Sequence, residues 1–168
     1  MSAPDAVESP VLQLLKDAFP AEVIAVHEQH GDATAVVRRD RIVDICRFLK
    51  ETPELAFEML SDECGVDRSR HSDRYQRFEV VLHLYSLTHN HRVRVRVPLP
   101  EDDPMMDTLT SLWKGANWFE REIWDMFGIR FAGHPDLRRL LLYDQFEGHP
   151  LRKDYPITRR QPLVGPIN

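Results

Sequence analysis

Two stretches in the middle of the chain alternate between apolar and polar side chains, which is typical of β-strands that bury one face. Residues 78–85 carry an apolar side chain at every second position, and residues 92–97 alternate Arg with Val. The sequence therefore predicts a β-hairpin with one apolar face. We expect Ser86 to lie opposite Val93, and this register fixes the remaining cross-strand pairs.

The first forty residues predict a helix followed by another hairpin. Ser9 as the N-cap and Pro10 at the first helical position start the helix, and apolar residues follow at helical spacing. Residues 23–30 and 33–38 are typical of two short strands. The Gly-Asp pair between these strands favours a tight turn.

A second helix and a third strand are predicted between the two hairpins. Asp40 can cap a helix that continues to Thr52, residues 57–60 begin a strand, and residues 62–73 are typical of a polar loop. Residues 98–104 are expected to be a linker. The order of helix, two strands, helix and three strands (α-β-β-α-β-β-β) predicts an α+β fold, a two-layer sandwich with helices on one face of a mixed sheet.

A last helix is predicted from residue 117 to residue 128. Asn117 is placed to act as the N-cap with Glu120 as its capping-box partner, and Gly128 is the residue type that ends helices in the left-handed conformation. Trp124 lies one position off the apolar stripe. The helix is therefore expected to have either a wide buried face or two buried faces.

The last forty residues differ in character from the rest of the chain. They are rich in Arg, His, Pro and Asp and lack apolar periodicity, so we predict an extended segment that rests on another surface. Residues 130–160 contain seven Lys or Arg and four Asp or Glu, a charge of +3 in a chain whose net charge is −5. We therefore expect an α+β domain, residues 1–128, and an extended partner-docking tail, residues 129–168.

Composition excludes several functional classes. Cys46 and Cys64 are eighteen positions apart, so they supply neither four thiolates for an iron–sulfur cluster nor the close-spaced pair of a structural zinc site. Cys46 is expected in the core. No apolar run reaches the roughly 20 residues of a membrane helix, and the absence of a secretory signal makes the cytoplasm the expected compartment. The mildly acidic chain argues against nucleic acid as a partner.

Catalytic or metal-binding interpretations of the C-terminal region are weak. Glu120 and Glu122 point about 200° apart on a helix and cannot share one ligand, so these acids and Asp125 are expected simply to suit the helix dipole. His134 and His149, each between Gly and Pro, form only a weak zinc signature. A small metal-dependent hydrolase built on these histidines is the remote alternative.

The middle hairpin carries histidines and arginines that allow other interpretations. His89 and His91 flank a turn residue and are expected to be solvated rather than to bind a metal. Arg92, Arg94 and Arg96 share one strand face, which the sequence leaves open to solvent or to a neighbouring chain.

The C-terminal region resembles the signature of the 30 kDa subunit of respiratory complex I, known in bacteria as the C subunit. The residues that carry the resemblance are Glu120-Arg121-Glu122, Asp125-Met126-Phe127, His134 and Arg138-Arg139-Leu140. The run from Phe146 to Pro156 is similar to the family's next block. The dense match spans residues 117–156, and the order of the upstream elements agrees with the family's domain.

The resemblance implies a non-catalytic structural subunit in the peripheral arm of proton-pumping NADH:quinone oxidoreductase. It implies no cofactor in this chain, because FMN, the iron–sulfur clusters and the quinone would belong to partner subunits. The expected partners are the quinone-site subunit (49 kDa, D type) and the subunits with the terminal iron–sulfur clusters (B and I types). The chain would lie at the cytoplasmic face of the cell membrane and touch it only through partners. An equivalent subunit of a membrane-bound hydrogenase or an F420H2 dehydrogenase is the alternative.

The same resemblance marks the residues expected at the subunit interface, with no catalytic and no metal-binding residue among them. Arg138, Arg139, Arg152 and Lys153 are expected to bond to carboxylates or carbonyls of partner subunits. The full set is Glu120, Arg121, Glu122, Asp125, His134, Arg138, Arg139, His149, Arg152, Lys153 and Asp154.

Overall fold

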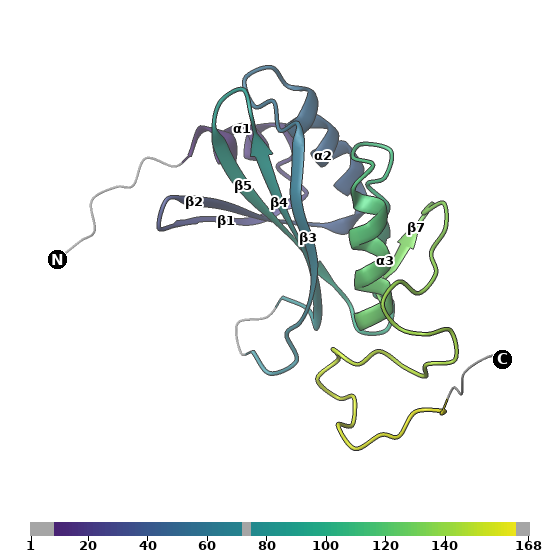
Figure 1. Cartoon of the computed structure of the whole chain (residues 1–168). Coiled ribbons are helices and arrows are strands. Elements are labelled where there is room, and N and C mark those ends of the chain that lie inside the picture. Colours follow the sequence, from purple (N-terminus) through teal and green to yellow (C-terminus); the bar gives the residue numbers. More distant parts are fainter. Residues whose placement is uncertain (1–8, 72–74, 164–168) are drawn as a thin grey trace.

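A computed structural model describes residues 9–71 and 75–163 (Figure 1). The elements are α1 (Pro10–Ala18), β1 (Val23–Gln29), β2 (Asp32–Val37), η1 (Arg39–Arg41), α2 (Ile42–Glu51), β3 (Met59–Asp67), β4 (Phe78–Ser86), β5 (His91–Leu99), β6 (Met105–Asp107), α3 (Ala116–Phe127) and β7 (Arg130–Ala132). The order confirms the predicted α-β-β-α-β-β-β arrangement and the α+β class.

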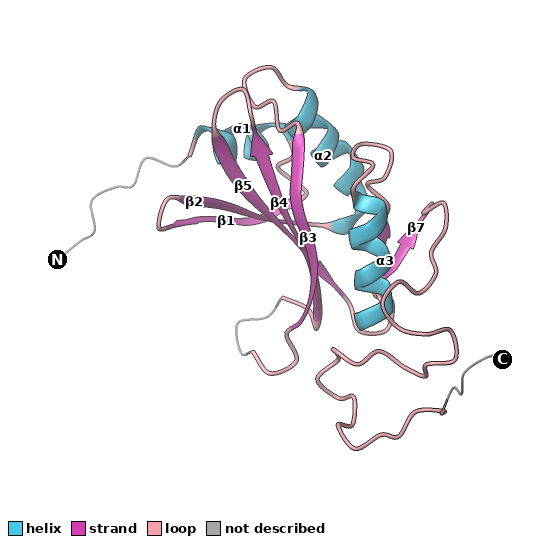
Figure 2. Ribbon diagram, in the orientation of Figure 1, coloured by secondary structure: helices cyan, strands magenta, loops and turns pink. Residues whose placement is uncertain are grey.

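One five-stranded sheet forms the body of the protein, with the strand order β1-β2-β5-β4-β3. β2 and β5 run parallel and the other neighbours run antiparallel, so the sheet is mixed, as predicted. α1 and α2 lie together on one side of the strands, and α3 stands alongside β3 (Figure 2). No helix in the two described ranges has the length and apolarity to cross a membrane.

The β1–β2 turn has the backbone that a tight hairpin requires. His30 and Gly31 both have positive φ, at 56° and 83°. Two adjacent left-handed residues twist a turn in the sense that matches the right-handed twist of the flanking strands. The hairpin is confirmed, but its turn residues are His30 and Gly31, one position earlier than the Gly-Asp pair, because Asp32 already pairs with Gln29.

The register of the β4–β5 hairpin differs from our expectation by two residues. Ser86 pairs with His91, and Leu84 pairs with Val93, because the connection is only four residues long and two further residues join the ladder. The N–H of His89 donates to Ser86 Oγ at 3.1 Å within this turn. A shift of two residues preserves the faces, so the valines still point into the core and the arginines away from it.

The prediction of a polar loop at residues 62–73 is wrong for residues 62–67, which belong to β3. β3 continues to Asp67 and pairs with β4 along its whole length. A strand at a sheet edge needs apolar side chains on one face only, so polar residues here do not break it. Residues 72 and 73 lie outside the described part of the chain.

Two smaller expectations are also corrected. Asp40 lies in the 3-10 turn η1 and does not cap α2, which begins after Arg41. Pro98 and Leu99 belong to β5, so the linker is shorter than expected. At the end of the linker, the guanidinium of Arg39 donates to the carbonyls of Asp103 and Met105 at 2.7 and 3.0 Å. These bonds hold the chain against η1.

The core lies between the sheet and the helices and includes Cys46, which is fully buried as expected. It does not end at residue 128. β7 pairs in parallel with β6, and Ile129 and Phe131 are buried with the rest of the core. The folded body therefore extends a few residues into the segment that was expected to be tail.

Gly65 lies at a close contact between α3 and β3. A Cβ atom at this position would lie 2.7 Å from Phe127 Cδ2 and 3.0 Å from Ile123 Cγ2. The absence of a side chain thus sets the separation between the helix and the strand.

Substituting Gly65→Ala should push α3 away from β3 and lower the free energy of unfolding by about 1–3 kcal/mol. Urea titration followed by circular dichroism measures the loss. In a Phe127→Ala background the same substitution should cost less, because the nearest ring atom is gone. An equal cost in both backgrounds would show that the contact with Phe127 is not the cause.

Candidate subunit interface around the last helix

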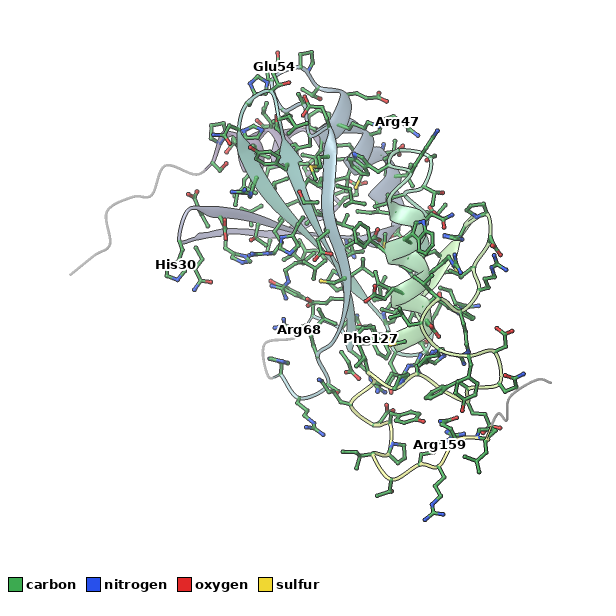
Figure 3. The ribbon with its side chains drawn as sticks, viewed as in Figure 1. His30, Arg47, Glu54, Arg68, Phe127 and Arg159 are labelled. Atoms are coloured by element: carbon green, nitrogen blue, oxygen red, sulfur yellow. The ribbon has the colours of Figure 1, made fainter. Side chains whose placement is uncertain are left out.

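α3 is buried on two sides, which confirms the expectation drawn from Trp124. Ile123 and Phe127 face β3 at Gly65, while Asp125 and Met126 are covered by the chain that follows β7. We call residues 133–163 the C-terminal segment. It loops beneath α3 in Figure 1, and Figure 3 shows Phe127 at the end of α3 that this segment reaches.

The start of α3 does not use the predicted capping box. The helix begins at Ala116 with Gly115 as its N-cap, and the backbone oxygen of Asn117 accepts a hydrogen bond from His134 Nε2 at 3.2 Å. The Glu120 side chain turns inward instead, where it accepts from Thr108 Oγ1 at 2.6 Å and from the N–H of Leu109 at 2.7 Å. Burial raises the pKa of Glu120 to about 7, against the lowering effect of these two donors.

Asp125 organises the other side of α3. Its carboxylate is completely buried, and Oδ2 accepts from three successive backbone N–H groups, those of Leu140, Leu141 and Leu142, at 3.0, 2.8 and 2.9 Å. Oδ1 accepts from Arg139 at 2.7 Å. Burial by itself would raise the pKa of Asp125, but these four donors outweigh it and hold the pKa below its ordinary value.

Arg139 extends this contact along the C-terminal segment. Its Nη2 donates to the carbonyls of Phe146 and Gly148 at 2.7 and 3.3 Å, and its guanidinium lies over the rings of Trp124 and Phe146. One side chain thus connects α3 to two separate points of an otherwise irregular segment.

The C-terminal segment also caps the end of α3. The last four carbonyls of a helix have no partner inside the helix. Gly128, in the left-handed conformation at φ 71° as predicted, donates its N–H to the carbonyl of Trp124 at 2.8 Å. The other three carbonyls accept from the segment in order, Asp125 from His149 Nδ1, Met126 from the N–H of Leu151 and Phe127 from Arg152 Nε.

A second attachment joins the segment to the end of β3. The buried carboxylate of Asp67 accepts from the N–H of Lys153 at 2.8 Å, from the N–H of Ser69 at 2.9 Å and from Arg77 at 3.2 Å. Arg77 also pairs with Asp154 at 2.8 Å. Burial opposes ionisation of Asp67, yet these donors lower its pKa to about 2.

The residues predicted for the interface therefore have mixed outcomes. Asp125 and Glu120 are not solvated acids at a helix start, because each is buried and hydrogen-bonded. Arg139 and Arg152 already bond within the chain, to the carboxylate of Asp125 and to the carbonyl of Phe127, and their bonds to a partner stay a prediction. Arg121 likewise donates to the carbonyls of Arg138 and Arg139. The residues left exposed are Glu122, Arg138, Lys153 and Asp154.

His134 and His149 are not brought together. His134 contacts Asn117 and His149 contacts Asp125, eight residues further along α3 and thus about 12 Å away along the helix axis. Within residues 9–71 and 75–163, no group of three or more metal-binding side chains converges. The geometry gives the remote hydrolase alternative no support.

The arginines of β5 have partners within the chain. Arg96 forms a bidentate pair with the buried Glu79, Arg94 lies 3.6 Å from Asp32, and Arg92 covers the ring of Tyr85. Glu79 was not predicted to be buried, although its place in an apolar strand beside an arginine-rich strand was a usable signal.

The histidines at the β4–β5 turn contact backbone oxygens of the chain that leads into β3. His89 Nε2 lies 2.8 Å from the carbonyl oxygen of Pro53, and His91 Nε2 lies 2.9 Å from that of Leu55. His91 also stacks on the ring of Phe57. His89 is exposed as expected, whereas His91 is only partly solvated.

Several large apolar side chains of the C-terminal segment are exposed. Leu141 and Leu151 are 61% and 49% exposed, and Ile157 and Leu163 are fully exposed. Trp118, on the first turn of α3, is 62% exposed. Such side chains are available for contact with another protein, which contiguous apolar patches typically mark.

The fold and this segment define a class of protein, a small α+β domain whose last helix holds a C-terminal segment without regular secondary structure. The family model described as "Respiratory-chain NADH dehydrogenase, 30 Kd subunit" matches residues 35–161. The chain belongs to this family.

Curated relatives agree over most of the chain. The C subunit of NADH-quinone oxidoreductase from Roseiflexus sp. (strain RS-1) is 48% identical over 147 residues, which cover 88% of this chain and 83% of the relative. The corresponding subunit "C 2" of NADH-quinone oxidoreductase from Rhizobium meliloti (strain 1021) is 47% identical over 161 residues, covering 95% of this chain and 86% of that one.

Solved structures share the fold. A trypsin-resistant fragment of Nqo5 matches with a TM-score of 0.66 and 36% identity, and the match covers 76% of this chain and 98% of the fragment. A chain of a membrane-bound sulfane sulfur reductase, an archaeal respiratory membrane complex, matches with a TM-score of 0.71 and 22% identity over 88% of this chain and 85% of that one. The second likeness concerns the fold alone.

Replacing Asp125 by Asn should detach the C-terminal segment from α3. The substitution leaves Arg139 without its buried counter-charge, so we expect the free energy of unfolding to fall by about 3–5 kcal/mol. Trypsin should then cut rapidly after Arg138 and Arg152, as followed by mass spectrometry. Glu122→Gln, on the exposed side of the same helix, is the control. It should change the free energy of unfolding by no more than about 0.5 kcal/mol and should leave the rate of trypsin cleavage nearly unchanged. Slow cleavage in Asp125→Asn would contradict this role.

The attachment at Asp67 should be sensitive to acid. Because the pKa of Asp67 is lowered in the folded chain to about 2, its contribution to stability is complete above the unfolded value of about 3.9 and is lost as the pH falls toward 2. The amide resonance of Lys153 in the folded chain should therefore lose its hydrogen-bonded chemical shift with a midpoint near about pH 2. In Asp67→Asn this transition should be absent, and an unchanged transition would assign it to another group.

Proposed function

We propose that this chain is a non-catalytic structural subunit of the peripheral arm of proton-pumping NADH:quinone oxidoreductase, supporting electron transfer from NADH through FMN and iron–sulfur centres to quinone. The observation that carries the proposal is the C-terminal segment, which is fixed to its own domain while its apolar side chains point outward. The names of the relatives identify the complex.

The arrangement of the segment supports a docking role that differs from the one expected at first. Partners do not have to satisfy its buried polar groups, because Asp125, Asp67 and the carbonyls of α3 already do so. A segment ordered before assembly loses less conformational entropy on binding, and this raises affinity for a given contact area. Leu141, Leu151 and Trp118 are the side chains that would be covered.

The partners proposed for this surface are the quinone-site subunit and the subunits with the terminal iron–sulfur clusters. Through them the chain would lie at the cytoplasmic face of the membrane as a peripheral protein. Exposed Arg138 and Glu122 would add polar contacts at the rim, which set orientation more than affinity.

We propose that the chain itself holds no cofactor and performs no chemical step. Cys46 is sealed in the core and Cys64 is half-buried on β3, which supports the absence of an iron–sulfur site. FMN, the iron–sulfur clusters and quinone would then be held by partner subunits. The high identity to NADH-quinone oxidoreductase subunits favours that complex over a membrane-bound hydrogenase or an F420H2 dehydrogenase.

The double substitution Leu141→Ser/Leu151→Ser should test this docking surface. Both side chains are exposed, so the stability of the isolated chain should change by less than about 0.5 kcal/mol, while incorporation into the complex should weaken at least about tenfold. Co-purification with tagged partner subunits measures the second effect. Leu87→Ser is the matched control, since Leu87 is 64% exposed in the β4–β5 turn. Normal assembly of the double variant would rule out this surface.

A further inference from the structure

Glu63 is the least satisfied charged residue in the described part of the chain. It lies in the middle of β3 with only 3% of its surface exposed. In residues 9–71 and 75–163, no hydrogen-bond donor reaches either of its carboxylate oxygens. An ionised carboxylate without a donor is among the most unfavourable groups that a protein interior can contain.

The surroundings of Glu63 make its ionisation more costly. Glu120 faces it from α3 and is itself fully buried. The other titratable groups nearby are Asp62 on β3, Cys46 on α2 and His134, whose Nε2 lies 3.9 Å from Glu120 Oε2. Burial, and next the charge of Glu120, raise the pKa of Glu63 well above its usual range.

The two acids are not equivalent. Glu120 accepts hydrogen bonds from Thr108 and from the backbone of Leu109, and such donors favour its charged form. Glu63 has no donor among the described residues, and two negative charges side by side in the interior repel each other strongly. A single proton on this pair is therefore best placed on Glu63.

We propose that Glu63 is protonated in the folded chain at neutral pH, and that loss of its proton weakens the packing of α3 on β3. The acid pair thereby makes the position of α3 depend on pH. Because α3 also carries Asp125, to which the C-terminal segment is attached, the same proton links the sheet to that segment. This coupling resides in the isolated chain and does not depend on the proposed function.

The pH dependence of unfolding provides the test. A carboxyl group with a raised pKa in the folded state takes up a proton on folding, so the folding equilibrium constant falls as the pH rises from about 4.3 toward the folded value. His83 and His149 have lowered pKa values in the folded chain, so they make the folding equilibrium constant rise with pH. This effect ends at about pH 6.5, the ordinary value for His. Glu120, with its pKa raised to about 7, contributes a slope of the same sign mainly below that pH. The thiols of Cys46 and Cys64, whose pKa values burial raises, begin to contribute near about pH 8.5, which leaves about pH 7.0–8.5 as the informative window.

In that window the equilibrium constant of the full-length wild-type chain should fall with a slope approaching about tenfold per pH unit. Glu63→Gln keeps the shape without the charge and should remove most of this slope, whatever its absolute stability. Glu122→Gln, at an exposed acid on α3, should retain it. Equal slopes in wild type and Glu63→Gln would overturn the proposal.

A direct measurement on the wild-type chain covers the case in which Glu63→Gln does not fold. The side-chain carboxyl carbon of Glu63, followed by nuclear magnetic resonance, should keep the chemical shift of the protonated form at least to about pH 7. Titration of this carbon near about 4.3, the ordinary value for Glu, would overturn the proposal.

Discussion

The buried carboxylate of Asp125 holds four hydrogen-bond donors in a place that water does not reach. Three of them are backbone N–H groups of Leu140 to Leu142 and the fourth is Arg139. A carboxylate with this many donors is stable in the interior. If either the carboxylate or one of its donors is removed, the remaining charge or amide is buried without a hydrogen-bond partner, which is unfavourable. This group fixes the C-terminal segment at residues 139–142, and the contacts at Asp67 and at the end of α3 fix it further along.

Other contacts of the segment follow from that fixed point. Once residues 140–142 are held against α3, Arg139 reaches Phe146 and Gly148, and the chain returns at His149 to cap the end of the helix. Each step satisfies backbone groups that a segment without regular secondary structure would otherwise present to solvent or to partners. A polar, Pro-rich segment thus obtains a defined conformation, and its leucines remain available on the outside.

The parts of the fold that rest on periodicity could be predicted from the sequence. The alternation of Val and Arg predicted β5, Gly128 predicted the end of α3, and the order of elements predicted the mixed sheet. The hairpin register was wrong because alternation has a period of two and does not distinguish Ser86 opposite His91 from Ser86 opposite Val93. The boundary at residue 128 was placed too early, because β7 is too short to show a pattern.

The interface was harder to predict than the fold. The resemblance marked Glu120, Asp125, Arg139 and Arg152, but their roles depend on backbone amides and carbonyls that no side-chain pattern encodes. Asp67 and Glu63 gave no signal at all, since each lies in a stretch whose composition is typical of a polar loop.

Hydrogen exchange at the backbone amides of Leu140, Leu141 and Leu142 in the isolated full-length chain measures whether Asp125 orders the C-terminal segment without a partner. If Asp125 fixes the C-terminal segment before any partner is present, these three amides should exchange at least about 100-fold more slowly than in an unstructured peptide. Exchange at the unstructured rate would show that the segment becomes ordered only in the complex, and would contradict the role assigned to Asp125.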